Sequence, residues 1–331
     1  MRDVAARAEV SVQTVSNIVN ERYHLMGDGT RARVEQAMSE LGYHPNVAAR
    51  TLRSARSETL AFLILDEGNQ FLADPMTDLV IAGIGDVARE RGYGLLIRAA
   101  LPHEPDASLL KPLLENRADG AFLFLSGEPD LRRWYVSRLV ELGFPFVLLE
   151  TSEVPGVTSV SAADRDGARE LTEHLIASGH KRIAFLTSAV PWPMLEQRLL
   201  GYRDALAAAG LQPLVFSGGT WTPASGAALG SRILDERRRP TAMMCGNDLL
   251  ALGVIRSVRE RGMTVPDDVA VTGFDDFHFA EFADPALTTV RIPGYDIGRA
   301  AGQALVDALE GRRRRRRRLV LPVELKLRAS G

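Results

Sequence analysis

Two short helical patterns lie within the first twenty residues, and the gap between them is too short for anything but a sharp turn. Small apolar residues recur at helical spacing after Asp3, and a second apolar stripe ends before Asn20. The break falls at Val10 and Ser11. The two helices must therefore pack crosswise. We expect Ser11 to cap the second helix, because its hydroxyl can accept a hydrogen bond from a free amide of the first turn.

The outward face of the second helix is polar but uncharged. Glutamine and asparagine can form paired hydrogen bonds to adenine, valine can contact the thymine methyl group, and small hydroxyls suit phosphate oxygens. This face therefore suits the major groove of DNA. We predict a helix-turn-helix domain over residues 1–44, whose DNA-facing residues are Ser11, Val12, Gln13, Thr14, Ser16 and Asn17.

A third helix is predicted from Thr30, so that three helices can enclose a small core within a domain of about fifty residues. The following segment, 45–57, is too short to form a stable helix alone. Three arginines and no carboxylate lie between Gly42 and Ser57, which favours folding on an acidic partner. The expected core positions of the third helix are Val34, Ala37, Met38 and Leu41.

From Glu58 onward, short apolar strands alternate with amphipathic helices, and the pattern repeats after residue 180. This alternation predicts two similar halves, each a doubly wound parallel sheet, with the last stretch crossing back between them. A ligand is expected in the cleft outside the carboxyl ends of the strands. The predicted strands are residues 59–65, 92–99, 120–125, 144–150, 181–188, 212–218, 240–247 and 268–274, followed by a strand in LVLPVEL.

The order of these motifs resembles the lac repressor (LacI) family of bacterial transcription regulators. The resemblance runs from VAARAEVSVQTVSNIVN through GHKRIAFL and PTAMMCGNDLLALG to VPDDVAVTGFDD, nearly the whole length. It implies a small all-α helix-turn-helix head and an α/β core over 58–331 of two doubly wound parallel-sheet subdomains, similar to periplasmic binding proteins. It also implies a homodimer on double-stranded, palindromic operator DNA, whose affinity a small molecule controls allosterically.

The resemblance further implies that residues 45–57 form a hinge helix, which pairs with its dimer mate in the minor groove. Leu52 stands where the family wedges a leucine between base pairs, which agrees with the physics of apolar intercalation. An ordinary linker leucine is the alternative. The hinge residues expected to contact DNA are Asn46, Ala49, Arg50 and Leu52.

A ligand site follows from the same resemblance together with the strand ends. Arg198 matches a family position where an arginine fork holds hydroxyls or a carboxylate, and Trp221 one where an aromatic ring faces the ligand. A carbohydrate is expected; a purine or an acidic metabolite is the alternative. Solvated or purely structural roles for these side chains also stay open. The expected ligand residues are Met76, Asp166, Arg198, Trp221, Asn247 and Asp275.

Several function classes are disfavoured. Gly83 and Gly85 resemble a dinucleotide fingerprint, but they lie almost twenty residues after a strand, so we interpret them as close-packing positions inside a helix. We find no arrangement typical of an enzyme and expect no cofactor or metal. The single cysteine, Cys245, excludes an internal disulfide. A sugar-binding protein without DNA function remains the rival hypothesis, disfavoured by residues 1–57.

Charge and hydropathy limit the remaining possibilities. The formal net charge is −2, so DNA affinity must come from local placement of arginines and helix N-termini. No apolar stretch is long enough to span a membrane, and none precedes the first helix as a signal would, so we expect a cytoplasmic protein. We interpret the seven arginines of 312–318 as a solvated loop, because like charges repel one another.

Overall fold

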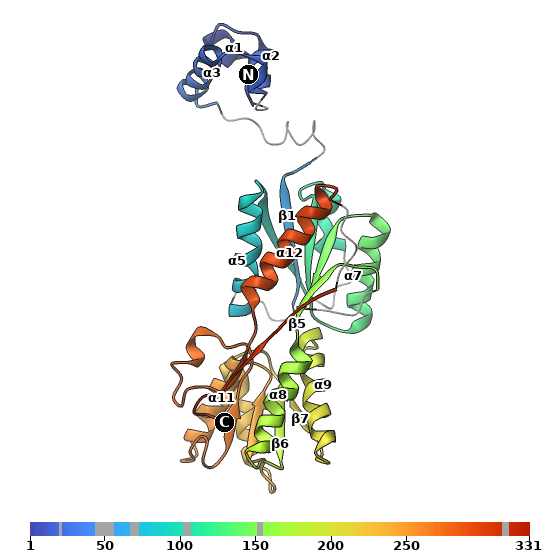
Figure 1. Ribbon diagram of the computed structural model, residues 1–331, viewed down its shortest axis with the longest axis vertical. Helices are drawn as coiled ribbons and strands as arrows, with labels where there is room; N and C mark the ends of the chain where they lie inside the picture. The colour runs from blue at the N-terminus through green and yellow to red at the C-terminus, as the bar shows by residue number, and fades with distance from the viewer. Residues whose placement is uncertain (20–21, 44–55, 67–72, 102–106, 151–154, 313–317) are drawn as a thin grey trace. The chain divides into compact units, whose positions relative to one another are not determined.

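The computed structural model describes residues 1–331 apart from 20–21, 44–55, 67–72, 102–106, 151–154 and 313–317 (Figure 1). The chain forms two compact units, Met1–Ser57 and Glu58–Gly331. Most of the arginine run lies outside the described residues. So do all four predicted hinge contacts, Asn46, Ala49, Arg50 and Leu52.

The first unit is a bundle of three short helices around its own small core. Ser11 Oγ accepts a hydrogen bond from the amide of Thr14 at 3.0 Å, which confirms the predicted cap of the second helix. A short 3-10 turn, which the sequence analysis did not predict, precedes the third helix. The elements are α1 (Arg2–Arg7), α2 (Val12–Val19), η1 (Tyr23–Leu25) and α3 (Asp28–Glu40). Their buried core consists of Val4, Ala5, Ala8, Val15, Ile18, Val34 and Ala37.

The prediction for the third helix was wrong at both of its ends. The helix begins at Asp28, two residues before Thr30. Leu41, predicted to be buried, is 47% exposed. It occupies the C-cap position, and Gly42 then turns the chain in the left-handed region with φ 56°. Leu41 therefore lies beyond the turn that packs on the core.

The N-terminal lobe of the second unit is built on a six-stranded parallel sheet in the order β11-β5-β4-β3-β1-β2. β1 and β3 are buried on both faces, which explains their unbroken apolar sequences. One face of the sheet packs against α5 and α12, the other against η2, α6 and α7. The strands are β1 (Thr59–Leu65), β2 (Gly94–Ala100), β3 (Gly120–Leu125), β4 (Phe146–Leu149), β5 (Ser159–Ala162) and β11 (Arg318–Leu321). The helices are α5 (Pro75–Glu90), η2 (Ala107–Leu110), α6 (Lys111–Leu114), α7 (Pro129–Leu142) and α12 (Gly294–Leu309).

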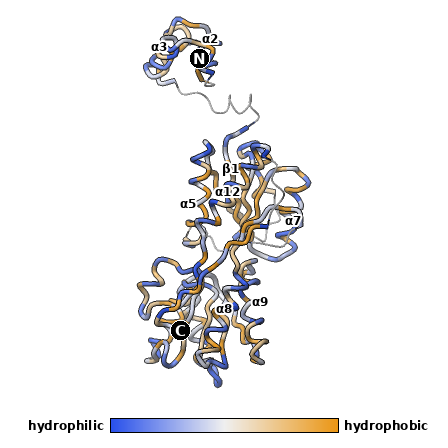
Figure 2. Tube along the Cα trace, viewed as in Figure 1, coloured by the Kyte–Doolittle hydropathy of each residue, from blue (hydrophilic) through white to orange (hydrophobic). Residues whose placement is uncertain are grey.

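The C-terminal lobe repeats this plan around a four-stranded parallel sheet in the order β7-β6-β8-β9. Hydrophobic residues follow the strands at the centre of each lobe (Figure 2). The strands are β6 (Ile183–Thr187), β7 (Leu214–Ser217), β8 (Ala242–Cys245) and β9 (Ala270–Thr272). The helices are α8 (Asp164–Ala177), α9 (Pro193–Ala208), α10 (Pro223–Leu234), α11 (Asp248–Arg259) and the short η3 (His278–Ala280).

The final stretch crosses between the lobes, as predicted. β10 (Thr289–Arg291) leaves the C-terminal lobe, α12 packs beside α5 in the N-terminal lobe, and β12 (Glu324–Lys326) returns to pair antiparallel with β10 (Figure 1). β5 and β10, four and three residues long, were not predicted, and the single strand predicted in LVLPVEL forms two short strands, β11 and β12. Such short runs carry almost no periodic signal.

The two glycines of the apparent fingerprint behave differently. A Cβ at Gly83 would lie 2.1 Å from the carbonyl oxygen of Tyr295, so this glycine allows α5 and α12 to touch, as predicted. The same prediction was wrong for Gly85, where a Cβ would meet no atom within 4 Å. Within the described residues, no helix is long and apolar enough to cross a bilayer.

Candidate functional site

The exposed face of α2 is the candidate DNA-binding surface. Ser11, Val12 and Gln13 are exposed, and Thr14 and Asn17 are half-buried. Gln13 Nε2 donates a hydrogen bond to Asn17 Oδ1 at 3.1 Å, so the two amides lie side by side one helical turn apart. Amide side chains of this kind carry the donors and acceptors that can pair with base edges.

Ser16 does not belong to this surface, and its predicted outward placement was wrong. Its side chain is only 9% exposed. Ser16 directly follows Val15, which is fully buried, and lies one turn before Val19, which packs on the core. Its position on the helix is therefore at the border of the packed face rather than opposite to it.

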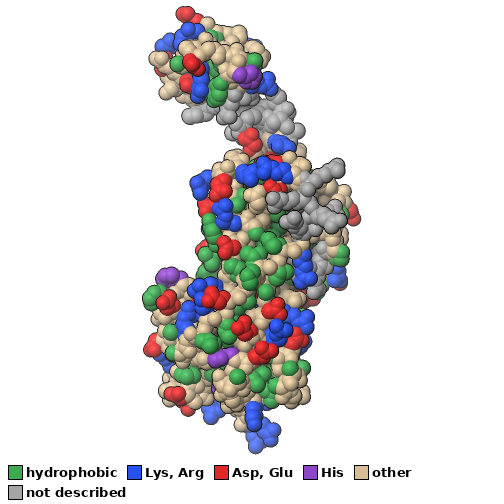
Figure 3. Space-filling model, in the orientation of Figure 1, with side chains coloured by type: hydrophobic (Ala, Val, Ile, Leu, Met, Phe, Trp, Pro, Cys, Tyr) green, Lys and Arg blue, Asp and Glu red, His purple; other side chains and the backbone are tan. Residues whose placement is uncertain are grey.

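Acidic and basic side chains are interspersed on the face of the first unit that Figure 3 shows. Some of the arginines pair within the unit, such as Arg7 with Glu40 at 2.6 Å and Arg31 with Glu35 at 2.6 Å. The described part of this unit therefore has no surface of a single sign on that side. Binding to DNA would depend on individual contacts rather than on bulk charge.

A buried arginine organises the cleft between the two lobes. Arg198, on α9, is 4% exposed. Its Nε donates to Asp164 Oδ1 at 2.7 Å and its Nη1 to the carbonyl of Gly246 at 2.6 Å, while Nη2 lies 2.8 Å from Asp275 Oδ1. The guanidinium also lies over the ring of Phe274, 4.0 Å from its centroid. Two hydrogen-bond acceptors and one ion-pair partner, from different elements, therefore fix this side chain.

Carboxyl groups outnumber cations around this arginine. Burial raises the pKa of Glu150 to about 8, with a further contribution from Asp164, and burial raises the pKa of Asp74 to about 6. Burial likewise raises the pKa values of Asp164 and Asp275, against the opposing effect of Arg198. At neutral pH Glu150 is therefore largely protonated and can donate as well as accept hydrogen bonds.

These side chains surround a cavity of about 30 Å³. Two tryptophans line it, Trp192 from the start of α9 and Trp221 from the loop before α10. Trp192 Nε1 and Glu150 Oε1 are buried and have no hydrogen-bond partner. The cavity thus combines aromatic faces with a free donor and a free acceptor. The lining residues are Asp74, Met76, Glu150, Trp192, Met194, Leu195, Arg198, Trp221, Asn247, Asp275 and Ile292.

Two residues of this cavity have unusual backbone conformations. Glu150 has φ 55° and Asp275 has φ 108°, both in the left-handed region of backbone conformation that residues other than glycine rarely adopt. Glu150 directly follows β4, and Asp275 lies shortly after the end of β9. Strained backbone of this kind tends to cluster at binding sites, where it directs a side chain into the site.

Five of the six predicted ligand residues meet at this cavity: Met76, Arg198, Trp221, Asn247 and Asp275. The sixth, Asp166, does not. Its side chain is 68% exposed and pairs with Arg169 at 3.4 Å. Asp166 lies in the first turn of α8, two residues after Asp164, so it points to a different side of the helix. Asp164 supplies the inward carboxylate instead.

Three other cavity residues, Glu150, Asp74 and Trp192, were not predicted as ligand residues. Glu150 was seen only as the end of a predicted strand, although a carboxylate at the mouth of a parallel strand is the same signal that identified Asp275. Asp74 caps α5 by accepting from the amide of Met76 at 3.0 Å. Trp192 carried no motif, and its place beside Phe124, with 4.7 Å between ring centroids, arises only from the meeting of the lobes.

Comparisons with known proteins identify relatives of both units. Residues 1–46 match the family described as "Bacterial regulatory proteins, lacI family", and residues 172–331 match the family described as "Periplasmic binding protein-like domain". The chain is 36% identical over 338 residues to the HTH-type transcriptional regulator CelR of Thermobifida fusca, covering 99% of this chain and 97% of that protein.

Two solved structures are similar over almost the full length. A complex of the transcriptional regulator CelR with cellobiose gives a TM-score of 0.74 at 33% identity, covering 99% of this chain and 98% of that one. The lac repressor dimer bound to operator and the anti-inducer ONPF gives a TM-score of 0.88 at 30% identity, covering 99% and 97%. The predicted fold class, a helical head with a two-lobed α/β core, is therefore confirmed.

Proposed function

The chain belongs to the LacI family of DNA-binding transcriptional regulators, and we propose that a carbohydrate bound between its two lobes controls its affinity for operator DNA. The observation that carries the ligand class is the pair of tryptophans beside unpartnered polar atoms in one cavity. Aromatic faces cover the apolar side of a sugar ring, and buried donors and acceptors bind its hydroxyls. CelR, which is similar over nearly the whole chain, is known in complex with cellobiose.

The first unit supplies the DNA contacts. The exposed face of α2 offers Val12, Gln13 and Asn17 to base edges, and the hydroxyls of Ser11 and Thr14 to phosphates. A homodimer would place two such helices in successive major grooves of a palindromic operator, as the lac repressor dimer is found on its operator. The hinge residues predicted to enter the minor groove keep that role as part of this proposal.

Ligand binding would change the arrangement of the lobes. A cavity of about 30 Å³ holds roughly one water molecule, far less than a sugar ring. The lobes or their side chains must therefore move to admit the ligand. The chain crosses between the lobes near β10 and β12, which pair with each other. A change in the position of one lobe would therefore also change the position of the other. The coupling between ligand and DNA would be about 1–3 kcal/mol, typical of allosteric proteins.

The proposal is tested by fluorescence anisotropy on labelled DNA from upstream of the chain's own coding region, titrated with protein in the presence of cellobiose, glucose and other sugars. We expect specific binding whose affinity one of these sugars changes. Trp221→Ala should keep the DNA affinity and lose the sugar response, whereas Trp134→Ala, a half-exposed tryptophan outside the cavity, should behave as wild type. Specific DNA binding that no carbohydrate alters would refute the proposed ligand class.

The rival functions find less support. The relatives are transcriptional regulators, not enzymes. No group of three or more histidine, cysteine, aspartate or glutamate side chains in the described ranges is arranged to hold a metal ion. A sugar-binding protein without DNA function would leave the polar face of α2 unexplained. Since operator DNA lies in the bacterial cytoplasm, we propose that the protein acts there.

A further inference from the structure

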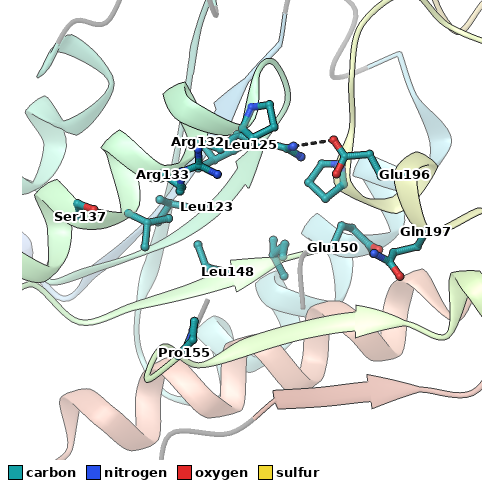
Figure 4. A pocket seen from close by; sticks show the side chains of 14 residues that line it. Leu123, Leu125, Arg132, Arg133, Ser137, Leu148, Glu150, Pro155, Glu196 and Gln197 are labelled. Carbon is teal, nitrogen blue, oxygen red and sulfur yellow. Dashed lines mark hydrogen bonds and ion pairs between the residues drawn. The ribbon is translucent and has the colours of Figure 1, made fainter. Parts of the chain in front are cut away.

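A second and larger cavity shares Glu150 with the sugar cleft and has a volume of about 480 Å³ (Figure 4). It lies between α7 of the N-terminal lobe and the first turn of α9, which belongs to the C-terminal lobe. Cavities that bind small molecules measure about 300–1,000 Å³. This one is therefore large enough for a ligand of its own.

The inner wall of this cavity is aliphatic. Leu123 and Leu125 come from β3, Val136 from α7 and Leu148 from β4. Among the described lining residues there is no aromatic side chain, whereas two tryptophans line the sugar cleft. The wall therefore suits a compact apolar body better than a hydroxyl-covered ring.

The rim of the cavity carries cations from one lobe and a carboxylate from the other. Arg132 on α7 donates to Glu196 on α9 at 2.6 Å, an ion pair that joins the two lobes (Figure 4). The Arg132 side chain is 13% exposed, so water screens it little. The neighbouring Arg133 pairs with Asp130, whose side chain is 89% exposed. Such a solvated pair contributes little, which leaves Arg133 able to bind another anion.

We propose that this cavity is a second effector site, which binds a small amphipathic anion. The apolar body of the ligand would pack on the four aliphatic side chains, and its acidic group would face Arg132 and Arg133. That group would compete with Glu196 for Arg132. Because the Arg132–Glu196 pair joins the lobes, and because α9 also carries Arg198, binding here would be transmitted to the sugar cleft.

The site can be tested without knowing the natural ligand. The probe is 1-anilinonaphthalene-8-sulfonate, an aromatic sulfonate that becomes fluorescent in apolar surroundings, titrated into the full-length protein. N-phenyl-1-naphthylamine has the same rings without the sulfonate and serves as the neutral control. We expect saturable binding of the anion at one site per chain and weaker binding of the neutral probe. Hydrogen exchange should show anion-dependent protection in residues 129–137 and 193–197.

Substitutions with opposite expected signs separate ligand binding from a merely structural role. Arg132→Gln should weaken the binding of the anionic probe by about tenfold, which is the usual effect of losing one charge-assisted hydrogen bond. Glu196→Gln removes the competing carboxylate and should strengthen binding of the anionic probe. Both variants nevertheless break the same ion pair between the lobes. Arg138→Gln, on the same helix but outside the cavity, should have no effect. Equal effects of Arg132→Gln and Glu196→Gln, or protection elsewhere in the chain, would overturn the proposal.

Discussion

At the scale of single residues, the two candidate sites differ in what holds their side chains. On α2 the polar residues contact mainly one another, as in the bond between Gln13 and Asn17. In the cleft, Arg198 is tied to two carboxylates and a carbonyl. Substitutions of the exposed polar residues of α2 should therefore affect partner binding alone, whereas a substitution of Arg198 should affect both binding and stability.

Gln13→Ala should lower specific operator affinity by about 1–3 kcal/mol, the contribution of a good bidentate base contact. The unfolding free energy should stay within about 0.5 kcal/mol of wild type, because the side chain is exposed. Anisotropy titrations with specific and random DNA measure the first effect, and urea unfolding measures the second. An equal loss of affinity for both DNAs would show that Gln13 contacts the backbone rather than a base.

Arg198→Ala should destabilise the second unit by about 3–5 kcal/mol, because it leaves Asp164 and Asp275 buried without their cation. It should also abolish the sugar response. Arg165→Ala breaks the exposed pair with Asp204 and should cost less than about 1 kcal/mol. Urea unfolding compares the two variants. A similar cost for both would mean that the Arg198 network contributes little net stability.

At the scale of elements, each lobe contains helix pairs that pack backbone against backbone, without intervening side chains. Gly83 lets α5 touch α12, Gly201 on α9 lets it touch α8, and Gly253 on α11 lets it touch α10. At each of these positions a Cβ would lie within about 2 Å of a backbone carbonyl oxygen of the partner helix, 2.1, 2.0 and 1.9 Å respectively. Backbone cannot move aside as a side chain can, so these contacts fix the spacing of the helices.

Gly83→Ala should therefore destabilise the second unit by about 1–3 kcal/mol through overpacking. Gly85→Ala is the matched control two residues later in α5, where a Cβ meets no atom within 4 Å. There the usual helical preference for alanine should add about 0.5–1 kcal/mol of stability. Urea midpoints of both variants measure the effects. A stabilising Gly83→Ala would contradict the close packing of α5 on α12.

At the scale of the whole molecule, the described parts of the two units have separate cores, and the buried carboxyls are concentrated in the second unit. Glu150, Asp74 and Asp248 all have pKa values raised by burial, to about 8, 6 and 7. The folded second unit therefore holds protons that the unfolded chain releases near pH 4. Its stability should depend on pH in a way that the first unit's does not.

The sign follows from this difference in bound protons. Between about pH 4.5 and 8 the folded state binds more protons than the unfolded chain, so the unfolding free energy should fall as pH rises. Each group contributes at most about 1.4 kcal/mol per pH unit. Urea unfolding at pH 5, 6, 7 and 8 measures the slope. Glu150→Gln stays neutral at every pH and should flatten the upper part of the curve; an unchanged slope would exclude Glu150 as its source.

The sequence by itself determined the periodic elements and their order, because hydrophobic spacing and strand-end polarity are local properties. The crossed helices at residues 2–19, the eight core strands predicted by residue range and the strand-end residues Asn247 and Asp275 follow from such patterns. Arg198 and Trp221 were assigned from the resemblance to a known family. Tertiary structure alone decided the rest. Ser16 is buried because it borders the face of α2 that packs on the core of the first unit. Asp164 rather than Asp166 points to Arg198 because the two carboxylates lie on different sides of α8. Trp192 contacts Phe124 only because the two lobes meet there. These outcomes depend on contacts between residues far apart in the chain, which no local pattern records.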